Sequence, residues 1–266
     1  MNTQSARDLV VRPVSPQLGR AFVRANHYSG KVTSNSQLHL GAFLNGRLVG
    51  VAQFGPPLDR SKVIGLVADT AWNDMLELNR LVMLDDTPRN SESRFISQCI
   101  RLIRKHAPNV QWLLSFADGT QCGDGTIYRA SGFVLTAIKR SDNLARLPDG
   151  SVIHKITLQN NAARPRPEAG GRSMYDMTGG KYDFEGYIKQ LRGTILPGFQ
   201  LRYIYFIDPS ARARLTVPVL PFSAIDEAGA GMYLGERRKH PSDAPVVQTG
   251  EGGAAPTPTL QSSAHT

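Results

Sequence analysis

The chain has 266 residues, of which 41% are hydrophobic, and it carries 31 Lys and Arg against 22 Asp and Glu, a formal net charge of +9. This length holds one large domain or one domain with extensions. The positive excess favours a polyanionic partner, chiefly nucleic acid. The only two cysteines, Cys99 and Cys122, exclude a disulfide framework and a four-cysteine zinc site.

The N-terminal stretch MNTQSARDLVV lacks the apolar core of a signal peptide, and no apolar run is long enough to span a bilayer. Two cysteines without a framework fit a reducing compartment. The sequence therefore predicts a cytoplasmic protein with no membrane partner.

The first part of the chain predicts a strand over 8–14 and a helix that starts at Pro16 with Ser15 as its N-cap. Polar residues follow the helix up to residue 37. Asn45-Gly46 is a strong hairpin signal, and it joins two expected strands, 38–44 and 47–54.

A strand is expected over 75–84, and a helix over 91–106. The helix has an apolar stripe at helical spacing, which places Cys99 in the core. The stripe consists of Phe95, Ile96, Cys99, Ile100 and Ile103.

Residues 110–133 read as strand, glycine loop and short helix. The arrangement places Asp118 at the carboxyl end of a strand and Tyr128 near the start of the helix at 126–131. Ligands bind at that edge of open α/β sheets. From residue types alone, a turn-capping Asp118 and a core Tyr128 remain an open alternative.

Two further strands, 134–139 and 152–158, complete a predicted α/β core with a mixed central sheet over residues 8–159. Residues 160–181, rich in Pro, Gly and Arg, predict a linker or insertion. A β-containing C-terminal extension over 182–235 should pack on the core, with a strand at 201–207 and a proline-interrupted extended segment at 215–222. Residues 236–266 have the composition of a disordered tail.

This order of elements resembles the GNAT acyltransferase fold, in which a splayed central strand and the helix after it receive a cofactor pyrophosphate. Five motifs further resemble the Mom family of phage DNA-modification proteins, and the matches spread over roughly residues 8–222. The motifs are Asn26-His27-Tyr28-Ser29, Leu78-Asn79-Arg80-Leu81-Val82, Ser115-Phe116-Ala117-Asp118, Gly125-Thr126-Ile127-Tyr128-Arg129-Ala130 and Arg202-Tyr203-Ile204-Tyr205-Phe206.

The resemblance implies a GNAT-like transferase that converts adenine in phage DNA to a carbamoylmethyl (acetamido) derivative on its exocyclic amine. The modification shields phage DNA from host restriction. The site residues implied are His27 as acceptor of the amine proton, Asp118 as its orienting carboxylate, Tyr28 as a stacking or proton-donating group, and Tyr128 as proton donor to a leaving thiolate. His27, Tyr28 and Asp118 are also candidate ligands of a non-haem iron.

The chain departs from the GNAT pattern where acetyl-CoA-binding members carry a glycine-rich loop, since residues 86–93 contain no glycine. A helix N-terminus still offers amides and a favourable dipole for phosphate. The donor therefore stays open between acetyl-CoA and another activated compound. Candidate donor-binding residues are Arg80, Arg89, Ser91, Ser93 and Arg94, while Asp86 and Glu92 oppose an anion there.

DNA contact is expected from basic residues spread along the chain, with the target adenine flipped out of the duplex or caught single-stranded. The candidates are Lys31, Arg60, Lys62, Arg129, Lys139, Arg140, Arg202, Arg212 and Arg214. Two other functions stay open: a coenzyme-A-dependent N-acyltransferase acting on a small amine or protein, and a non-catalytic DNA-binding protein. The oligomeric state, a homodimer included, is open as well.

Overall fold

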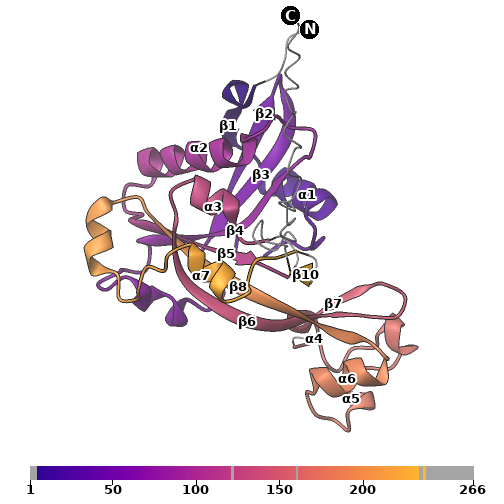
Figure 1. Cartoon of the computed structure of the whole chain (residues 1–266). Helices are drawn as coiled ribbons and strands as arrows, with labels where there is room; N and C mark the ends of the chain where they lie inside the picture. The colour runs from indigo at the N-terminus through magenta and orange to yellow at the C-terminus, as the bar shows by residue number, and fades with distance from the viewer. Residues whose placement is uncertain (1–4, 121–122, 160, 234–235, 238–266) are drawn as a thin grey trace, which may run out of the picture.

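The computed structural model describes residues 5–120, 123–159, 161–233 and 236–237 of the chain. It is a mixed α/β structure built on an eight-stranded sheet flanked by helices (Figure 1). The strand order is β1-β2-β3-β4-β5-β8-β6-β7. The strands are Val10–Pro13 (β1), Leu38–Leu44 (β2), Arg47–Gly55 (β3), Met75–Met83 (β4), Trp112–Asp118 (β5), Val134–Arg146 (β6), Val152–His154 (β7) and Thr194–Phe206 (β8), and Met232–Tyr233 (β9) pairs with Glu236–Arg237 (β10) apart from this sheet.

Helices cover both faces of the sheet. On β3, Val51 packs with Val23 of the first helix, whereas its neighbour Ala52 belongs to the cluster that contains Phe95 of the second. Because successive strand side chains point to opposite faces, these two helices lie on opposite sides. In the described part of the chain, no helix is long and apolar enough to cross a membrane. The helices are Pro16–Asn26 (α1), Ser91–His106 (α2), Thr126–Ala130 (α3), Lys155–Gln159 (α4), Met174–Met177 (α5), Phe184–Gln190 (α6) and Ser223–Glu227 (α7).

The strongest local signals in the sequence are confirmed. The Ser15 hydroxyl accepts a hydrogen bond from the Leu18 amide at 3.2 Å, and Pro16 is the first residue of α1. Asn45 and Gly46 have φ values of 49° and 80° in the β2–β3 hairpin turn, the left-handed conformation that this dipeptide tolerates. The apolar stripe of α2, Cys99 included, is buried.

A gap in the middle of the sheet positions the functional site. The parallel strands β4 and β5 pair only where Met75, Leu76 and Glu77 lie opposite residues 112–114. Beyond that point β4 continues along β3 toward Met83, while β5 continues along β8 toward Asp118. The carboxyl ends of the two strands therefore separate, as the expected splayed strand requires.

The C-terminal part of the chain differs from the expected division. Residues 194–206 form β8, which lies between β5 and β6 and pairs with both. The sheet of residues 8–159 is thus incomplete without a strand from the expected extension over 182–235. The 215–222 segment is extended, with isolated bridges from Leu215 to Val67 and from Leu220 to Leu135.

The region expected as a linker or insertion over 160–181 contains the short helices 167–169 and α5. Only Val152–His154 of the strand expected over 152–158 is extended, and the chain then turns into α4, which buries Leu158. Leu158 packs with Met174 of α5 and Tyr187 of α6 in a separate apolar cluster. Of the tail expected to be disordered over 236–266, all but β10 lies outside the described residues.

Candidate active site

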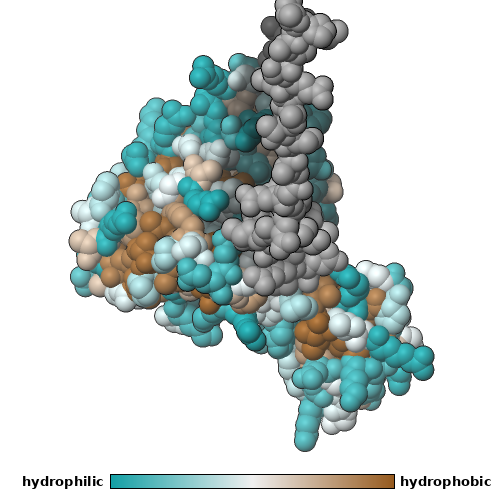
Figure 2. Space-filling view, in the orientation of Figure 1, coloured by the Kyte–Doolittle hydropathy of each residue, from teal (hydrophilic) through white to brown (hydrophobic). Residues whose placement is uncertain are grey.

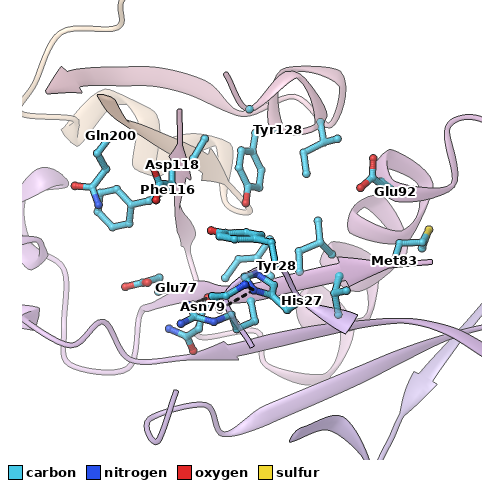
Figure 3. Close-up of a pocket in the computed structure, with 18 of the residues that line it drawn as sticks. His27, Tyr28, Glu77, Asn79, Met83, Glu92, Phe116, Asp118, Tyr128 and Gln200 are labelled. Atoms are coloured by element: carbon cyan, nitrogen blue, oxygen red, sulfur yellow. Dashed lines mark hydrogen bonds between the residues drawn. The ribbon is translucent and has the colours of Figure 1, made fainter. Parts of the chain in front are cut away.

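A cavity of about 640 Å³ fills the gap between the separated ends of β4 and β5 (Figure 3). Its walls come from β4, the end of β5, the loop after α1, the start of α3 and the end of β7. This volume lies in the usual range for small-molecule sites. The four residues expected to be catalytic, His27, Tyr28, Asp118 and Tyr128, all line it.

Tyr28 and Tyr128 approach each other from opposite walls of the cavity (Figure 3). Tyr28 is 56% exposed and lies against the ring of His27, with 4.1 Å between ring centroids. Tyr128 is 8% exposed, and its ring packs against Tyr203 and Phe133 at 5.3 and 5.4 Å. The ring of Tyr28 is thus exposed at the cavity, while Tyr128 is buried and packed against two other rings.

Gly125 leaves the space that the rings of Tyr128 and Tyr203 occupy. Its φ is +74°, and a Cβ placed there would lie 2.6 Å from the ring of Tyr203 and 3.0 Å from that of Tyr128. Both the backbone conformation and the space therefore require glycine. The Tyr203 hydroxyl donates to the Asp124 carbonyl, which ties this loop to β8.

His27 is a neutral imidazole. Burial, assisted by the charge of Arg80, lowers its pKa to about 4. The Ser29 amide donates to Nδ1 at 3.1 Å, and the Ser29 hydroxyl lies 2.8 Å from the same nitrogen. These hydrogen bonds assign the proton of the neutral ring to Nε2. Before the reaction, Nε2 of His27 is therefore a hydrogen-bond donor. The sequence-based expectation was that His27 accepts a proton.

Arg80 holds the loop that carries His27. Its Nε donates to the Lys31 carbonyl at 3.1 Å, and its Nη1 donates to the Asn79 carbonyl at 2.7 Å. Among the residues expected to bind the donor, Arg80 lines the cavity. A guanidinium used in this way fixes loop geometry and places a positive charge at the cavity wall.

Glu77 and His154 also line the cavity, and the motifs did not single them out. Burial raises the pKa of Glu77 against opposing effects from Asn79 and Arg80. Burial lowers the pKa of His154, while the charge of Asp118 acts to raise it. An acidic residue inside the apolar run of β4 was a usable signal for Glu77. His154 had none, because its place depends on the β6–β7 pairing.

The other residues expected to bind the donor lie at the start of α2 and are divided between two places. Ser91 is 2% exposed, and within the described structure its buried Oγ has no hydrogen-bond partner. Arg89, Ser93 and Arg94 line a separate hollow, where Arg94 donates to the Arg7 carbonyl at 3.1 Å. Glu92 faces the main cavity, and burial, together with Asp85, raises its pKa.

The metal alternative gains no support from side-chain geometry. The residues that the structure describes contain no group of three or more His, Cys, Asp or Glu side chains that could hold a metal ion. His27 and Tyr28 line the cavity from the loop after α1, whereas Asp118 lines it from the end of β5. Cys122, weighed as a nucleophile in the glycine loop, lies outside the described residues.

The residues expected to contact DNA come from several parts of the fold. Lys31 lines the cavity, and the Arg129 guanidinium stacks on Phe222 with 5.3 Å to the ring centroid. Arg202 bonds to Thr136 across the sheet. Arg214 donates to Gln111, next to the opposite end of β5 from Asp118, and the exposed Arg212 lies on the same short helical segment.

Comparisons with known proteins agree with the motifs. The model of the Mom protein family matches residues 8–224. The methylcarbamoylase Mom of Escherichia phage Mu is 36% identical over 211 residues, covering 79% of this chain and 80% of that protein. Solved structures with some likeness include the Escherichia coli ribosomal-protein-S18-alanine N-acetyltransferase (12% identity, TM-score 0.37, 75% of this chain and 94% of that one) and aminoglycoside 6'-acetyltransferase type Ii (8%, 0.39, 75% and 98%). On the family model and the phage Mu relative, the chain belongs to the Mom protein family.

Proposed function

We propose that this chain is a transferase that attaches a carbamoylmethyl group to the exocyclic amine of adenine in DNA, which protects phage DNA from host restriction. Membership of the Mom family and the phage Mu relative, named a methylcarbamoylase, support this function. The observation that carries it is the convergence of His27, Tyr28, Asp118 and Tyr128 on one cavity between β4 and β5.

The chemistry starts from a weak nucleophile, because the lone pair of the adenine amine is delocalised into the ring. As the nitrogen bonds to the incoming group it must lose a proton, and a positioned acceptor speeds that step. Glu77 suits this role because it lines the cavity and burial raises its pKa, which makes its carboxylate a stronger proton acceptor than an exposed one. Asp118 orients the amine from the end of β5.

His27 and Tyr128 act on the group donor. The Nε2–H of the neutral His27 donates a hydrogen bond to the carbamoyl oxygen of the donor, which positions the methylene carbon beside the adenine amine. The Tyr128 hydroxyl gives its proton to the leaving group. The adenine nitrogen bonds to the methylene carbon of the carbamoylmethyl group while the bond from that carbon to the leaving group breaks, and the leaving group departs with the proton from Tyr128.

A phosphate-bearing donor of the acyl-coenzyme-A type would be held at the start of α2. Ser91 offers a buried hydroxyl there, and Asn90 gives the helix no side-chain cap. An uncapped helix N-terminus attracts an anion. The carboxylate of Glu92 would repel a phosphate there. The positive charge of Arg80 at the cavity wall offsets this repulsion, so we include Arg80 in the donor site.

The target amine is base-paired inside a duplex, so the adenine must leave the stack or be bound single-stranded. Tyr28 is the exposed aromatic ring at the cavity, and it is placed to stack on an incoming base. Stacking on an aromatic side chain contributes about 1–3 kcal/mol per base.

Nucleoside mass spectrometry on DNA from cells that express the chain tests this function. We expect carbamoylmethyl adenine with the unaltered chain and none with Asp118→Asn, which removes the carboxylate charge at nearly constant size. The matched control Asp149→Asn changes an exposed turn residue and should leave the product yield unchanged. An acetyl adduct would favour an ordinary N-acyltransferase, and unmodified adenine with a folded, expressed chain would favour a non-catalytic DNA-binding protein.

A further inference from the structure

The segment between β6 and β8, residues 147–193, forms a projection that we call the arm. The antiparallel β6–β8 ribbon continues past the end of β5, from Gln200 opposite Lys139 to Thr194 opposite Arg146, and carries the arm away from the rest of the molecule (Figure 1). The arm has its own apolar core, which includes Leu158 and Tyr187, both 0% exposed. It is a small folded unit on a two-stranded stalk.

Three acidic side chains of the arm take part in helix caps and an ion pair. Asp176 accepts from the Ser173 amide at 2.8 Å, and Asp183 accepts from the Gly186 amide at 2.9 Å. Glu168 pairs with Arg166 at 3.4 Å. These carboxylates keep their charge, but seven Lys and Arg against five Asp and Glu over residues 147–193 leave the arm with a formal net charge of +2.

Most basic side chains of the arm are exposed. Five of them take part in none of the ion pairs found among the described residues. Figure 2 shows the outer end of the arm as hydrophilic. Such a surface attracts a polyanion and is repelled by cationic partners. The five residues are Arg164, Arg172, Lys181, Lys189 and Arg192.

The positive surface of the arm reaches the mouth of the cavity. His154 and Ile156, at the base of the arm, line the cavity, and the Lys31 ammonium donates to the Thr157 hydroxyl. Burial, together with the positive charge of Arg166, lowers the pKa of Lys31. A bound phosphate group would offset the repulsion between these two positive charges.

We propose that the arm, together with Lys31, is the surface that holds the phosphate backbone of DNA beside the cavity. This inference rests on the proposed function, because it takes DNA as the partner of the same site. Lys31 and Arg166 bind the phosphate next to the extruded adenine, and the exposed cations of the arm bind phosphates farther along the strand. Such contacts position the DNA without reading its sequence.

The test measures the affinity of the full chain for a fluorescent adenine-containing duplex over a range of salt concentrations. The variant combines Arg164→Gln, Lys181→Gln and Arg192→Gln, three exposed side chains on different parts of the arm. Each lost phosphate contact lowers the slope of log Kd against log salt by about 0.9, so the slope should fall by about 2 to 3 and affinity by about tenfold or more. The single changes Arg164→Gln and Lys181→Gln, each expected to lower the slope by about 0.9, extend the test if the triple variant melts early.

The matched control combines Arg101→Gln, Arg104→Gln and Lys105→Gln, which remove the same charges from the exposed face of α2. It should leave the slope close to that of the unaltered chain. Equal losses in both triple variants would reduce the effect to net charge and overturn the assignment of the arm. An unchanged slope in the arm variants, with adenine still modified by the unaltered chain, overturns the arm inference alone. Absence of modified adenine and of salt-dependent binding in the unaltered chain counts against the proposed function itself.

Discussion

The body of the molecule, formed by the sheet and α1–α3, and the arm over 147–193 use charge in opposite ways. In the body, burial lowers the pKa of His27 and raises that of Glu77, and both shifts favour the uncharged form of the side chain. The arm keeps its apolar residues in a small core and turns cations such as Lys181 and Arg192 to solvent. Buried polar groups suit bond-making, whereas exposed cations suit phosphate contact. The two tasks thus lie on separate units of one chain.

His27→Ala should give the largest difference between the two regions, because it should affect product formation and leave DNA affinity unchanged. Loss of its Nε2–H donor and of the loop contacts to Ser29 should lower product formation by about two to four orders of magnitude, the range for a lost proton-transferring or proton-donating group. DNA affinity should stay within the range of the unaltered chain. Product yield is measured by nucleoside mass spectrometry and affinity by fluorescence anisotropy. His106→Ala, at the exposed end of α2, is the control and should change neither quantity.

Tyr128→Phe should slow the reaction by about 100-fold or more if the leaving group needs a proton from this hydroxyl. The ring contacts with Tyr203 and Phe133 remain, so stability should change little. Single-turnover rates with saturating DNA give the measurement. Tyr175→Phe removes an exposed hydroxyl from the arm and should leave the rate unaltered. Equal rates for the two variants would assign Tyr128 to packing alone.

A matched pair of core substitutions separates the stabilities of the two regions. Leu113 in the body and Leu158 in the arm are both 0% exposed, and replacing either by Ala should cost about 2–5 kcal/mol. Because the two residues belong to different clusters, Leu158→Ala should speed hydrogen exchange mainly in the arm. Leu113→Ala should speed it throughout the body. Hydrogen–deuterium exchange of both variants is measured by mass spectrometry. The same pattern of faster exchange in both would show that body and arm unfold as one unit.

Acidification should weaken the body through His27. Its folded pKa of about 4 lies below the ordinary 6.5, so the unfolded chain binds the proton more readily between these values. The contribution of neutral His27 to the free energy of unfolding is therefore fully present above pH 6.5. It decreases as the pH drops toward 4, by at most about 3 kcal/mol. Urea denaturation at pH 7 and pH 4.5 measures the loss. His27→Gln should show a smaller loss than the unaltered chain, and an equal loss would remove His27 as its source.

Local pattern was enough to predict the elements whose signals lie within a few residues. The Ser15 cap, the Asn45-Gly46 turn and the apolar stripe of α2 each depend on neighbours in sequence, and the structure confirms them. The family motifs led to His27, Tyr28, Asp118 and Tyr128 as candidates, and the fold brings all four to one cavity. Their catalytic roles remain a prediction.

Tertiary structure alone decided which distant segments meet. Thr194–Phe206 enters the sheet between β5 and β6 because its backbone hydrogen bonds and buried side chains such as Leu201 and Ile204 match both neighbours, and strand pairing over such separations leaves no periodic signal. The same pairing places residues 147–193 between β6 and β8 as the arm. It also brings His154 to the wall of the cavity. The sequence by itself determined the local elements and the residue types of the site, whereas long-range pairing determined the order of the sheet and the complete set of groups around the cavity.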